Sequence, residues 1–130
     1  MTKSRILVVD DESNLSDLVR LYLEKTQRYE VRVENRSALA LSAAREFRPH
    51  LVLLDVDMPG KDGGDVAAEI QAEPALRGVQ ILFLTSLISP EEARERETIK
   101  GGMRFLSKPV SPNVLIETVD RALGGLAHVG

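Results

Sequence analysis

The chain has 130 residues, no cysteine and a formal net charge of −3 at pH 7, with 43% hydrophobic and 28% charged residues. A chain of this length fits one domain, whose folding buries roughly two thirds of the surface that the unfolded chain exposes. The lack of cysteine excludes disulfides and thiolate metal sites, and the slight excess of acids argues against binding to nucleic acid or to an anionic membrane surface.

The opening segment, MTKSRILVVDDE, has too short an apolar run before its acids to be a signal peptide. No stretch approaches the roughly 18 apolar residues of a membrane-spanning helix. We therefore expect a cytoplasmic protein with a single domain over residues 1–130, a core at about 4–124 and a short C-terminal tail at 125–130.

Apolar runs alternate with amphipathic patterns along the chain. Continuous apolar runs are typical of strands buried on both faces of a parallel sheet, and apolar residues spaced at i, i+3 and i+4 are typical of helices. In chain order, the sequence predicts strands at 5–9, 30–34, 51–54, 80–84 and 103–106, and helices at 13–26, 36–47, 64–73, 89–100 and 111–123.

Proline, serine and glycine mark the ends of several predicted helices. Two helices stop before Pro49 and Pro74, because the residue before proline is disfavoured in the helical conformation. The last two helices open with the Ser-Pro pairs at 89–90 and 111–112, which suit an N-cap and a first helical position, and Gly124 closes the last helix. Strands that alternate with helices in this way predict an α/β fold with a parallel sheet and helices on both faces.

Polar side chains follow most of the predicted strands. In open parallel sheets, ligands bind beyond the carboxyl ends of the strands, so we expect these groups to converge at one edge of the sheet. They are Asp10, Asp11 and Glu12 after the first strand, Asp55 and Asp57 after the third, Thr85 and Ser86 after the fourth, and Ser107, Lys108 and Pro109 after the fifth.

The expected cluster predicts phosphoryl-transfer chemistry. Several carboxylates in a small volume repel one another unless a cation lies between them, and Mg²⁺ binds through carboxylates while it keeps waters and phosphate oxygens as ligands. Lys108 offers a positive charge, and Thr85 a hydroxyl donor, to a phosphoryl group. Asp55 ends the most hydrophobic strand and is the best candidate for a carboxylate nucleophile that forms an aspartyl phosphate.

The chain resembles the response-regulator receiver domains of two-component signalling, chemotaxis receivers included. The resemblance covers essentially all 130 residues and rests on ILVVDDE, LVLLDVDMPGKDGG, LFLTS and FLSKPVSP, in that order. Each motif alone is weak, but four in order are specific. The resemblance implies a flavodoxin-like, doubly wound (βα)5 fold whose five-stranded parallel sheet has the order 2-1-3-4-5.

The resemblance also assigns the acidic residues. Asp55 would be phosphorylated by a histidine kinase or a histidine phosphotransfer protein. Mg²⁺ would bind the side chains of Asp11 and Asp55 and the main-chain carbonyl of Asp57, and Asp10 would support the metal through water.

The remaining implied roles concern phosphoryl binding and switching. Lys108 and Thr85 would bind the phosphoryl group, and Phe105 would turn inward to fill the space that Thr85 leaves. Ser86 stands where alanine or glycine is usual and would narrow access to the phosphoryl group. The bond from Lys108 to Pro109 would be cis.

The expected output is a change of surface. Phosphorylation adds about −1.5 to −2 charge at one point and can bias a two-state element. The surface of the fourth helix, fifth strand and fifth helix would switch to bind an unidentified downstream protein, and a homodimer through the same surface is a further expectation. The protein would be a stand-alone phosphoacceptor switch, with slow autodephosphorylation, and not an enzyme with a separate substrate.

Two alternatives stay open. One is a receiver-like interaction module that is never phosphorylated, which failure to bind Mg²⁺ or a phosphoryl analogue would favour. The other is a phosphatase of the haloacid-dehalogenase type, because the Asp-Val-Asp at 55–57 resembles the nucleophile loop of those enzymes. In those enzymes the acidic pair follows the lysine, whereas here Asp10 and Asp11 precede Lys108.

Overall fold

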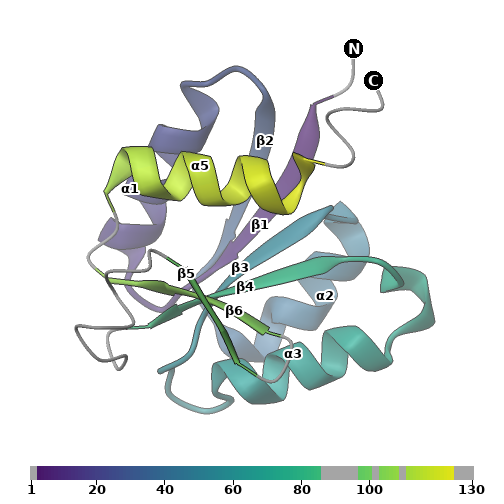
Figure 1. Cartoon of the computed structure of the whole chain (residues 1–130). Helices are drawn as coiled ribbons and strands as arrows, with labels where there is room; N and C mark the ends of the chain where they lie inside the picture. The colour runs from purple at the N-terminus through teal and green to yellow at the C-terminus, as the bar shows by residue number, and fades with distance from the viewer. Residues whose placement is uncertain (1–2, 86–96, 101–102, 109–110, 125–130) are drawn as a thin grey trace.

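The computed structural model describes residues 3–85, 97–100, 103–108 and 111–124 (Figure 1). The strands are β1 (Ser4–Val9), β2 (Tyr29–Glu34), β3 (Leu51–Asp55), β4 (Gln80–Thr85), β5 (Glu97–Lys100) and β6 (Met103–Ser107). The α-helices are α1 (Ser13–Glu24), α2 (Ala40–Phe47), α3 (Gly63–Ala72) and α5 (Pro112–Ala122), and short 3-10 helices occur at η1 (Ser37–Leu39) and η2 (Pro74–Leu76).

The strands form one sheet in the order β2-β1-β3-β4-β6-β5. The pairs β1–β2, β1–β3, β3–β4 and β4–β6 are all parallel. These five strands are the five that the sequence predicts, and their order confirms the expected 2-1-3-4-5 arrangement. Because they run in one direction, their carboxyl ends lie along one edge of the sheet.

The sixth strand, β5, corrects one expectation. A helix was predicted at 89–100, but residues 97–100 are extended and pair antiparallel with β6, with Lys100 opposite Met103. Thr98 and Ile99 are β-branched and favour an extended backbone, and the Gly-Gly pair that follows in the sequence is typical of hairpin connections. Residues 89–96 of the predicted helix lie outside the described residues.

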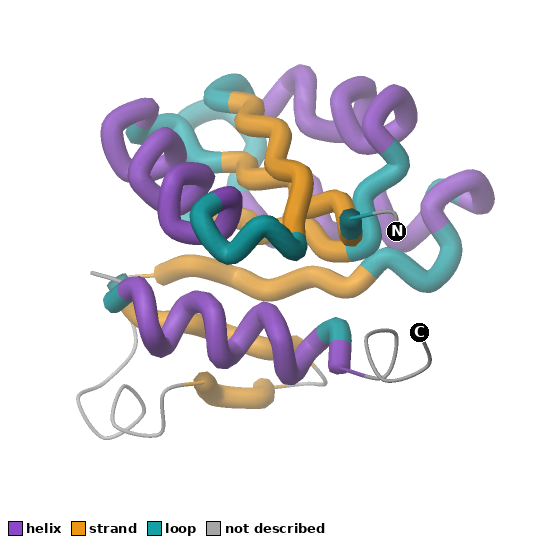
Figure 2. Tube along the Cα trace, turned by 90° about the horizontal axis from the view of Figure 1, so that it is seen from above, coloured by secondary structure: helices purple, strands orange, loops and turns teal. Residues whose placement is uncertain are grey.

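The sheet is buried between two layers of helices, as the sequence predicts (Figure 1, Figure 2). Alternate residues of β1 face opposite sides: Ile6 and Val8 pack with α1 and α5, and Leu7 and Val9 pack with α2 and α3. Residues 51–55 of β3 are buried throughout, which explains why its sequence is a continuous apolar run up to Asp55.

Capping hydrogen bonds and backbone conformation mark the ends of the helices. The side chain of Asp62 accepts from the backbone N–H of Asp65 and so caps α3, and Ser111 caps α5 through the N–H of Val114. Before Pro49, Arg48 ends α2 in the left-handed region with φ 53°.

Across the part of the chain that the structure describes, no helix has the length and apolar character needed to cross a membrane.

Candidate functional site

Three aspartates meet at the carboxyl edge of the sheet. Asp10, Asp11 and Asp55 each present a carboxylate oxygen, and these oxygens all lie within 4.8 Å of one another. Asp10 directly follows β1 and Asp55 ends β3, and the two strands are hydrogen-bonded neighbours, with Val9 opposite Leu54. Parallel pairing of β1 with β3 therefore brings the acids together, as the sequence predicts.

The cluster combines buried and exposed carboxylates. Asp10 is 0% exposed and Asp55 is 2% exposed, whereas Asp11 is exposed to solvent. Burial of two like charges is unfavourable unless partners neutralise them. The arrangement therefore needs positive charge, from the protein or from a bound cation.

Lys108 supplies part of that charge. Its Nζ lies 3.1 Å from Asp55 Oδ1, 3.2 Å from Asp10 Oδ2 and 3.2 Å from Glu12 Oε1. The Lys108 side chain is only 13% exposed, and its backbone N–H donates to the carbonyl of Thr85 over 2.9 Å. One ammonium thus faces three carboxylates, and the site keeps a surplus of negative charge.

Backbone donors hold the two buried carboxylates in place. The N–H of Glu12 donates to Asp10 Oδ1 over 2.9 Å, and the N–H of Asp57 donates to Asp55 Oδ1 over 3.3 Å. The side-chain amide of Asn35 donates to the carbonyl of Asp10 over 2.7 Å. These bonds fix the loops that follow β1 and β3 relative to the acids.

The environment shifts the pKa values of the central pair. Burial raises the pKa of Asp55 to about 6, and the negative charge of Asp10 adds to the rise. The hydrogen bond and charge of Lys108 and the hydrogen bond from the N–H of Asp57 act in the opposite direction and lower it. Burial lowers the pKa of Lys108, but the hydrogen bond with Asp55 and the charges of Asp10 and Asp55 outweigh it, so the net shift is upward. At neutral pH, Asp55 is mostly ionised and Lys108 is charged.

The donor set fits a hard divalent cation. Among the described residues, Asp10 Oδ2 is a buried oxygen without a hydrogen bond, although it makes an ion-pair contact with Lys108. A buried carboxylate oxygen in that state favours a cation, and three carboxylates within reach of one point suit Mg²⁺. The direct contact of Asp57 with a metal through its main-chain carbonyl stays a prediction.

The turn after β3 is packed tightly against Asp55. Gly63 donates its N–H to the carbonyl of Val56 over 2.9 Å, and a Cβ at Gly63 would lie 2.6 Å from the carbonyl oxygen of Asp55. Ser37 also holds this turn: its hydroxyl donates to the carbonyl of Pro59 and accepts from the N–H of Lys61. The motif KDGG contains Gly63, but nothing in the sequence indicated either contact.

The predicted switch residues are only partly placed. Thr85 is buried, 4% exposed, at the end of β4. Phe105 is half-buried and stacks on Phe83, with ring centroids 5.1 Å apart and planes inclined by 22°. Movement of Thr85 and Phe105 on phosphorylation stays a prediction. Ser86 and Pro109, and with Pro109 the expected cis bond, lie outside the described residues.

The sequence predicted that Glu12 lies at this edge of the sheet, but it gave Glu12 no role at the site. An acid after a strand most often caps the helix that follows, and Glu12 does occupy the N-cap position of α1. Its side chain makes no capping hydrogen bond and instead contacts Lys108. Only the direction of the side chain, which the sequence does not encode in any pattern, distinguishes the two roles.

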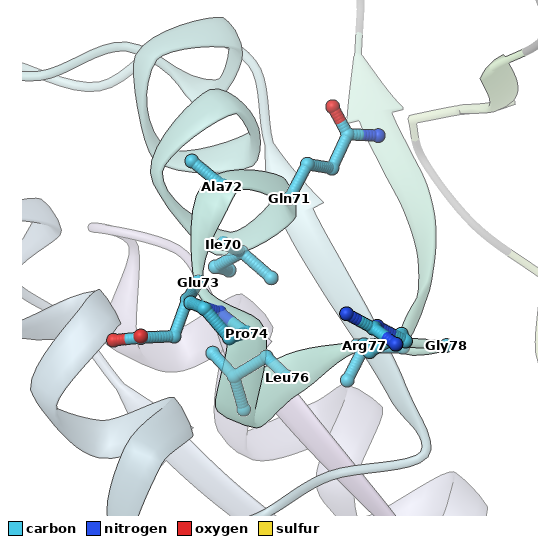
Figure 3. Close-up of a pocket in the computed structure, with 9 residues that line it drawn as sticks. Ile70, Gln71, Ala72, Glu73, Pro74, Leu76, Arg77 and Gly78 are labelled. Atoms are coloured by element: carbon cyan, nitrogen blue, oxygen red, sulfur yellow. The ribbon is translucent and has the colours of Figure 1, made fainter.

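Two of the hollows among the described residues differ in how they lie relative to the aspartate cluster. One, of about 330 Å³, adjoins Asp11 and is lined by residues 35–38 and 58–61. The other, of about 280 Å³, is lined by residues 70–74 and 76–79, at the amino end of β4 (Figure 3). In Figure 3 the carboxylate of Glu73, which pairs with Arg45, points away from Arg77. That second hollow gathers no set of acids and lies away from the aspartate cluster.

Known proteins resemble this chain over nearly its whole length. The polar-differentiation response regulator DivK of Brucella ovis is 35% identical over 127 residues, which cover 95% of this chain and 98% of DivK. The DNA-binding response regulator MtrA of Mycolicibacterium paratuberculosis is 32% identical over 117 residues, which cover 90% of this chain. The chain spans about half the length of MtrA, 50%.

A solved structure gives the same result for the fold. The chemotaxis response regulator CheY4 of Vibrio cholerae superimposes with a TM-score of 0.79 at 29% identity, covering 94% of this chain and 100% of CheY4. The family model described as the response regulator receiver domain matches residues 6–120. The flavodoxin-like receiver fold and the resemblance to receivers are both confirmed. The chain belongs to the response-regulator receiver domain family of two-component signalling.

Proposed function

We propose that this protein is a phosphoacceptor switch in which Asp55 takes a phosphoryl group from the phosphohistidine of a histidine kinase or phosphotransfer protein. The observation that supports it best is the buried Asp55 with the Lys108 ammonium 3.1 Å from its Oδ1, beside Asp10 and Asp11. A carboxylate held beside a fixed positive charge is arranged for nucleophilic attack on phosphorus.

The transfer is a substitution at phosphorus. A carboxylate oxygen of Asp55 forms the new P–O bond while the bond from phosphorus to the donor's imidazole nitrogen breaks, and the electron pair of that bond returns to the nitrogen. Among the described residues, Lys108 and Asp57 both donate hydrogen bonds to Oδ1 of Asp55. We therefore propose that Oδ2 is the oxygen that attacks phosphorus. The product is an acyl phosphate on Asp55.

The charges around Asp55 determine how that step is stabilised. The transferring group carries negative charge on its oxygens, and Lys108 neutralises part of it from a position that is already fixed. A Mg²⁺ held by Asp11 and Asp55 with the Asp57 carbonyl, and by Asp10 through water, would neutralise more of it when bound. The hydroxyl of Thr85 would donate to a phosphoryl oxygen.

Loss of the phosphoryl group and the readout follow from the same residues. We propose slow hydrolysis of the acyl phosphate by water, so the chain acts on itself and not on a separate substrate. Thr85 and Phe105 would shift on phosphorylation and change the surface around β6 and α5. A downstream protein, or a second copy of the chain, would bind that surface.

The organisation of the protein is part of the proposal. The match to nearly the whole of DivK supports a single receiver domain over residues 1–130. The net charge of −3 gives no support for direct binding to nucleic acid. Phosphotransfer from a histidine kinase would take place in the cytoplasm.

Phosphorylation by a small donor tests the proposal. The wild-type protein and an Asp55→Asn variant would be incubated with Mg²⁺ and acetyl phosphate, and their intact masses measured. We expect one phosphoryl adduct on the wild type, no adduct on Asp55→Asn, and loss of the adduct with a chelator. Asp17→Asn, which removes an exposed acid of α1, is the matched control and should keep the adduct.

Three other outcomes would contradict the proposal. An adduct on Asp55→Asn would place the acceptor elsewhere. The absence of any adduct, with acetyl phosphate and with a phosphorylated phosphotransfer protein as donor, would favour the interaction module that is never phosphorylated. Turnover of a phosphomonoester that survives removal of Asp11 would favour the phosphatase.

A further inference from the structure

Lys108 has a partner outside the metal-binding and acceptor set. Glu12 Oε1 accepts a hydrogen bond from Lys108 Nζ over 3.2 Å. The side chain of Glu12 is 63% exposed, while that of Lys108 is 13% exposed. Glu12 therefore reaches from the surface to an ammonium that is otherwise enclosed by Asp10 and Asp55.

The backbone of Glu12 is fixed at the entrance of the acidic site. Its N–H donates to Asp10 Oδ1 over 2.9 Å, and its carbonyl accepts from the N–H of Ser16 over 3.0 Å, the first hydrogen bond of α1. Because both the N–H and the carbonyl of Glu12 are hydrogen-bonded, its backbone is fixed, and its side chain extends to Lys108 from a defined position. It makes no capping bond to α1 that would compete with this contact.

The three partners of Lys108 differ in what else they must do. Asp55 is the proposed acceptor and a proposed metal ligand, and Asp10, in the same cluster, is proposed to support the metal. A divalent cation at the cluster would bind the carboxylates that now pair with Lys108, and it would repel the Lys108 ammonium. Glu12 has no part in the cation site, so its attraction for Lys108 persists when that site is filled.

We propose that Glu12 is a positioning residue for Lys108. It holds the ammonium at the entrance of the acidic site and so lessens the competition between Lys108 and a divalent cation for Asp10 and Asp55. Without Glu12, the carboxylates that remain as partners of Lys108 are those that the cation needs, and cation binding becomes weaker. This inference rests on the proposed function, in which Lys108 and Mg²⁺ share one site.

A simpler role for Glu12 makes a different prediction. A negative charge at the first turn of α1 stabilises the helix through the helix dipole, and it also attracts any cation nearby. Both effects act whether or not Lys108 is present. A double-mutant cycle between Glu12 and Lys108 therefore separates the positioning role from a general effect of charge.

The experiment measures the Mg²⁺ dissociation constant by following backbone amide resonances during titration with MgCl₂. The proteins are the wild type, Glu12→Gln, Lys108→Met and the double variant, with Asp17→Asn as a control that removes one exposed charge from the same helix. Thermal unfolding of each variant checks that it is folded. Lys108→Gln replaces Lys108→Met in the cycle if the latter does not fold.

We expect Glu12→Gln to change the Mg²⁺ dissociation constant more when Lys108 is present than when Lys108 is replaced. Glu12→Gln should weaken Mg²⁺ binding by about threefold to fivefold when Lys108 is present, the range expected from an exposed ion pair, and by less than about twofold when it is absent. Asp17→Asn should change binding by less than about twofold. Glu12→Gln that weakens binding equally in both backgrounds would overturn the positioning role.

The outcome also distinguishes this inference from the proposed function. Coupling between Glu12 and Lys108 in a protein that neither acetyl phosphate nor a phosphorylated phosphotransfer protein phosphorylates would support the positioning role and contradict the phosphoacceptor role. A wild-type protein that does not bind Mg²⁺ would overturn both.

Discussion

Replacement of Gly63 by alanine should destabilise the protein although it adds only one methyl group. A Cβ at this position would lie 2.6 Å from the carbonyl oxygen of Asp55 and 2.8 Å from Val56 Cα. Both atoms belong to the backbone, at the end of β3 and in the turn after it, so neither can move away as the tip of a flexible side chain could. The first turn of α3 must therefore shift away from β3.

The size of the effect follows from the geometry. Overpacking of a well-packed site typically costs about 1–3 kcal/mol, and contacts this short against backbone belong at the upper end of that range. Alanine gains up to about 1 kcal/mol over glycine inside a helix, which offsets only part of the loss. We expect the free energy of unfolding to fall by about 2 kcal/mol, and the urea midpoint by roughly 1 M.

The neighbouring glycine provides the control. At Gly64 a Cβ would lie 3.3 Å from Asp62 Oδ1, a side-chain atom, and the structure gives no other close contact for it. Gly64→Ala should therefore change the free energy of unfolding by less than about 1 kcal/mol. Urea unfolding followed by circular dichroism measures both variants. Gly63→Ala as stable as the wild type would refute the inference that this turn is held against Asp55 by close packing.

Two further predictions concern other parts of the fold. His50 Nδ1 accepts the backbone N–H of Arg5 over 2.9 Å, and burial, with the charge of Arg5, lowers the pKa of His50. The unfolded chain then takes up the proton first, so the contribution of His50 to stability is complete above about pH 6.5 and is lost as the pH falls through the lowered pKa of the folded state. His50→Asn keeps an acceptor but does not titrate, so its unfolding free energy should fall less than that of the wild type between pH 7 and pH 5; equal losses would contradict this role. Ser37→Ala removes the hydroxyl that bridges Pro59 and Lys61 and should lower the free energy of unfolding by about 1 kcal/mol, whereas no change in urea unfolding would mean that the turn does not depend on it.

Much of the fold and the core of the site could be predicted from the sequence, for identifiable reasons. The buried parallel strands are continuous apolar runs, and their polarity changes abruptly where each strand ends. Since parallel strands end at one edge of the sheet, Asp10, Asp55 and Lys108 were expected to meet, and Lys108 Nζ does lie within 3.2 Å of both carboxylates. The strand order came from the resemblance to receivers, because local patterns do not order strands.

The features that were not predicted depend on contacts between distant segments. The segment that ends with β5 is rich in glutamate and arginine and reads locally as a helix, yet residues 97–100 pair with β6. Pairing across a sheet can override a local helical preference. The direction of the Glu12 side chain and the closeness of Gly63 to Asp55 are also tertiary facts, since each requires two segments to approach one another.

The electrostatics of the site connect its stability to its function. Burial and the charge of Asp10 raise the pKa of Asp55 to about 6, so the ionised carboxylate is less stable in the folded chain than in water. The same burial excludes solvent from the carboxylate that is proposed to attack phosphorus, and it strengthens the interaction with Lys108. Lys108 offsets only part of the repulsion, because it faces three carboxylates with one charge. A divalent cation would offset more of the repulsion, and because the unfolded chain lacks the assembled cluster, such binding would favour the folded state.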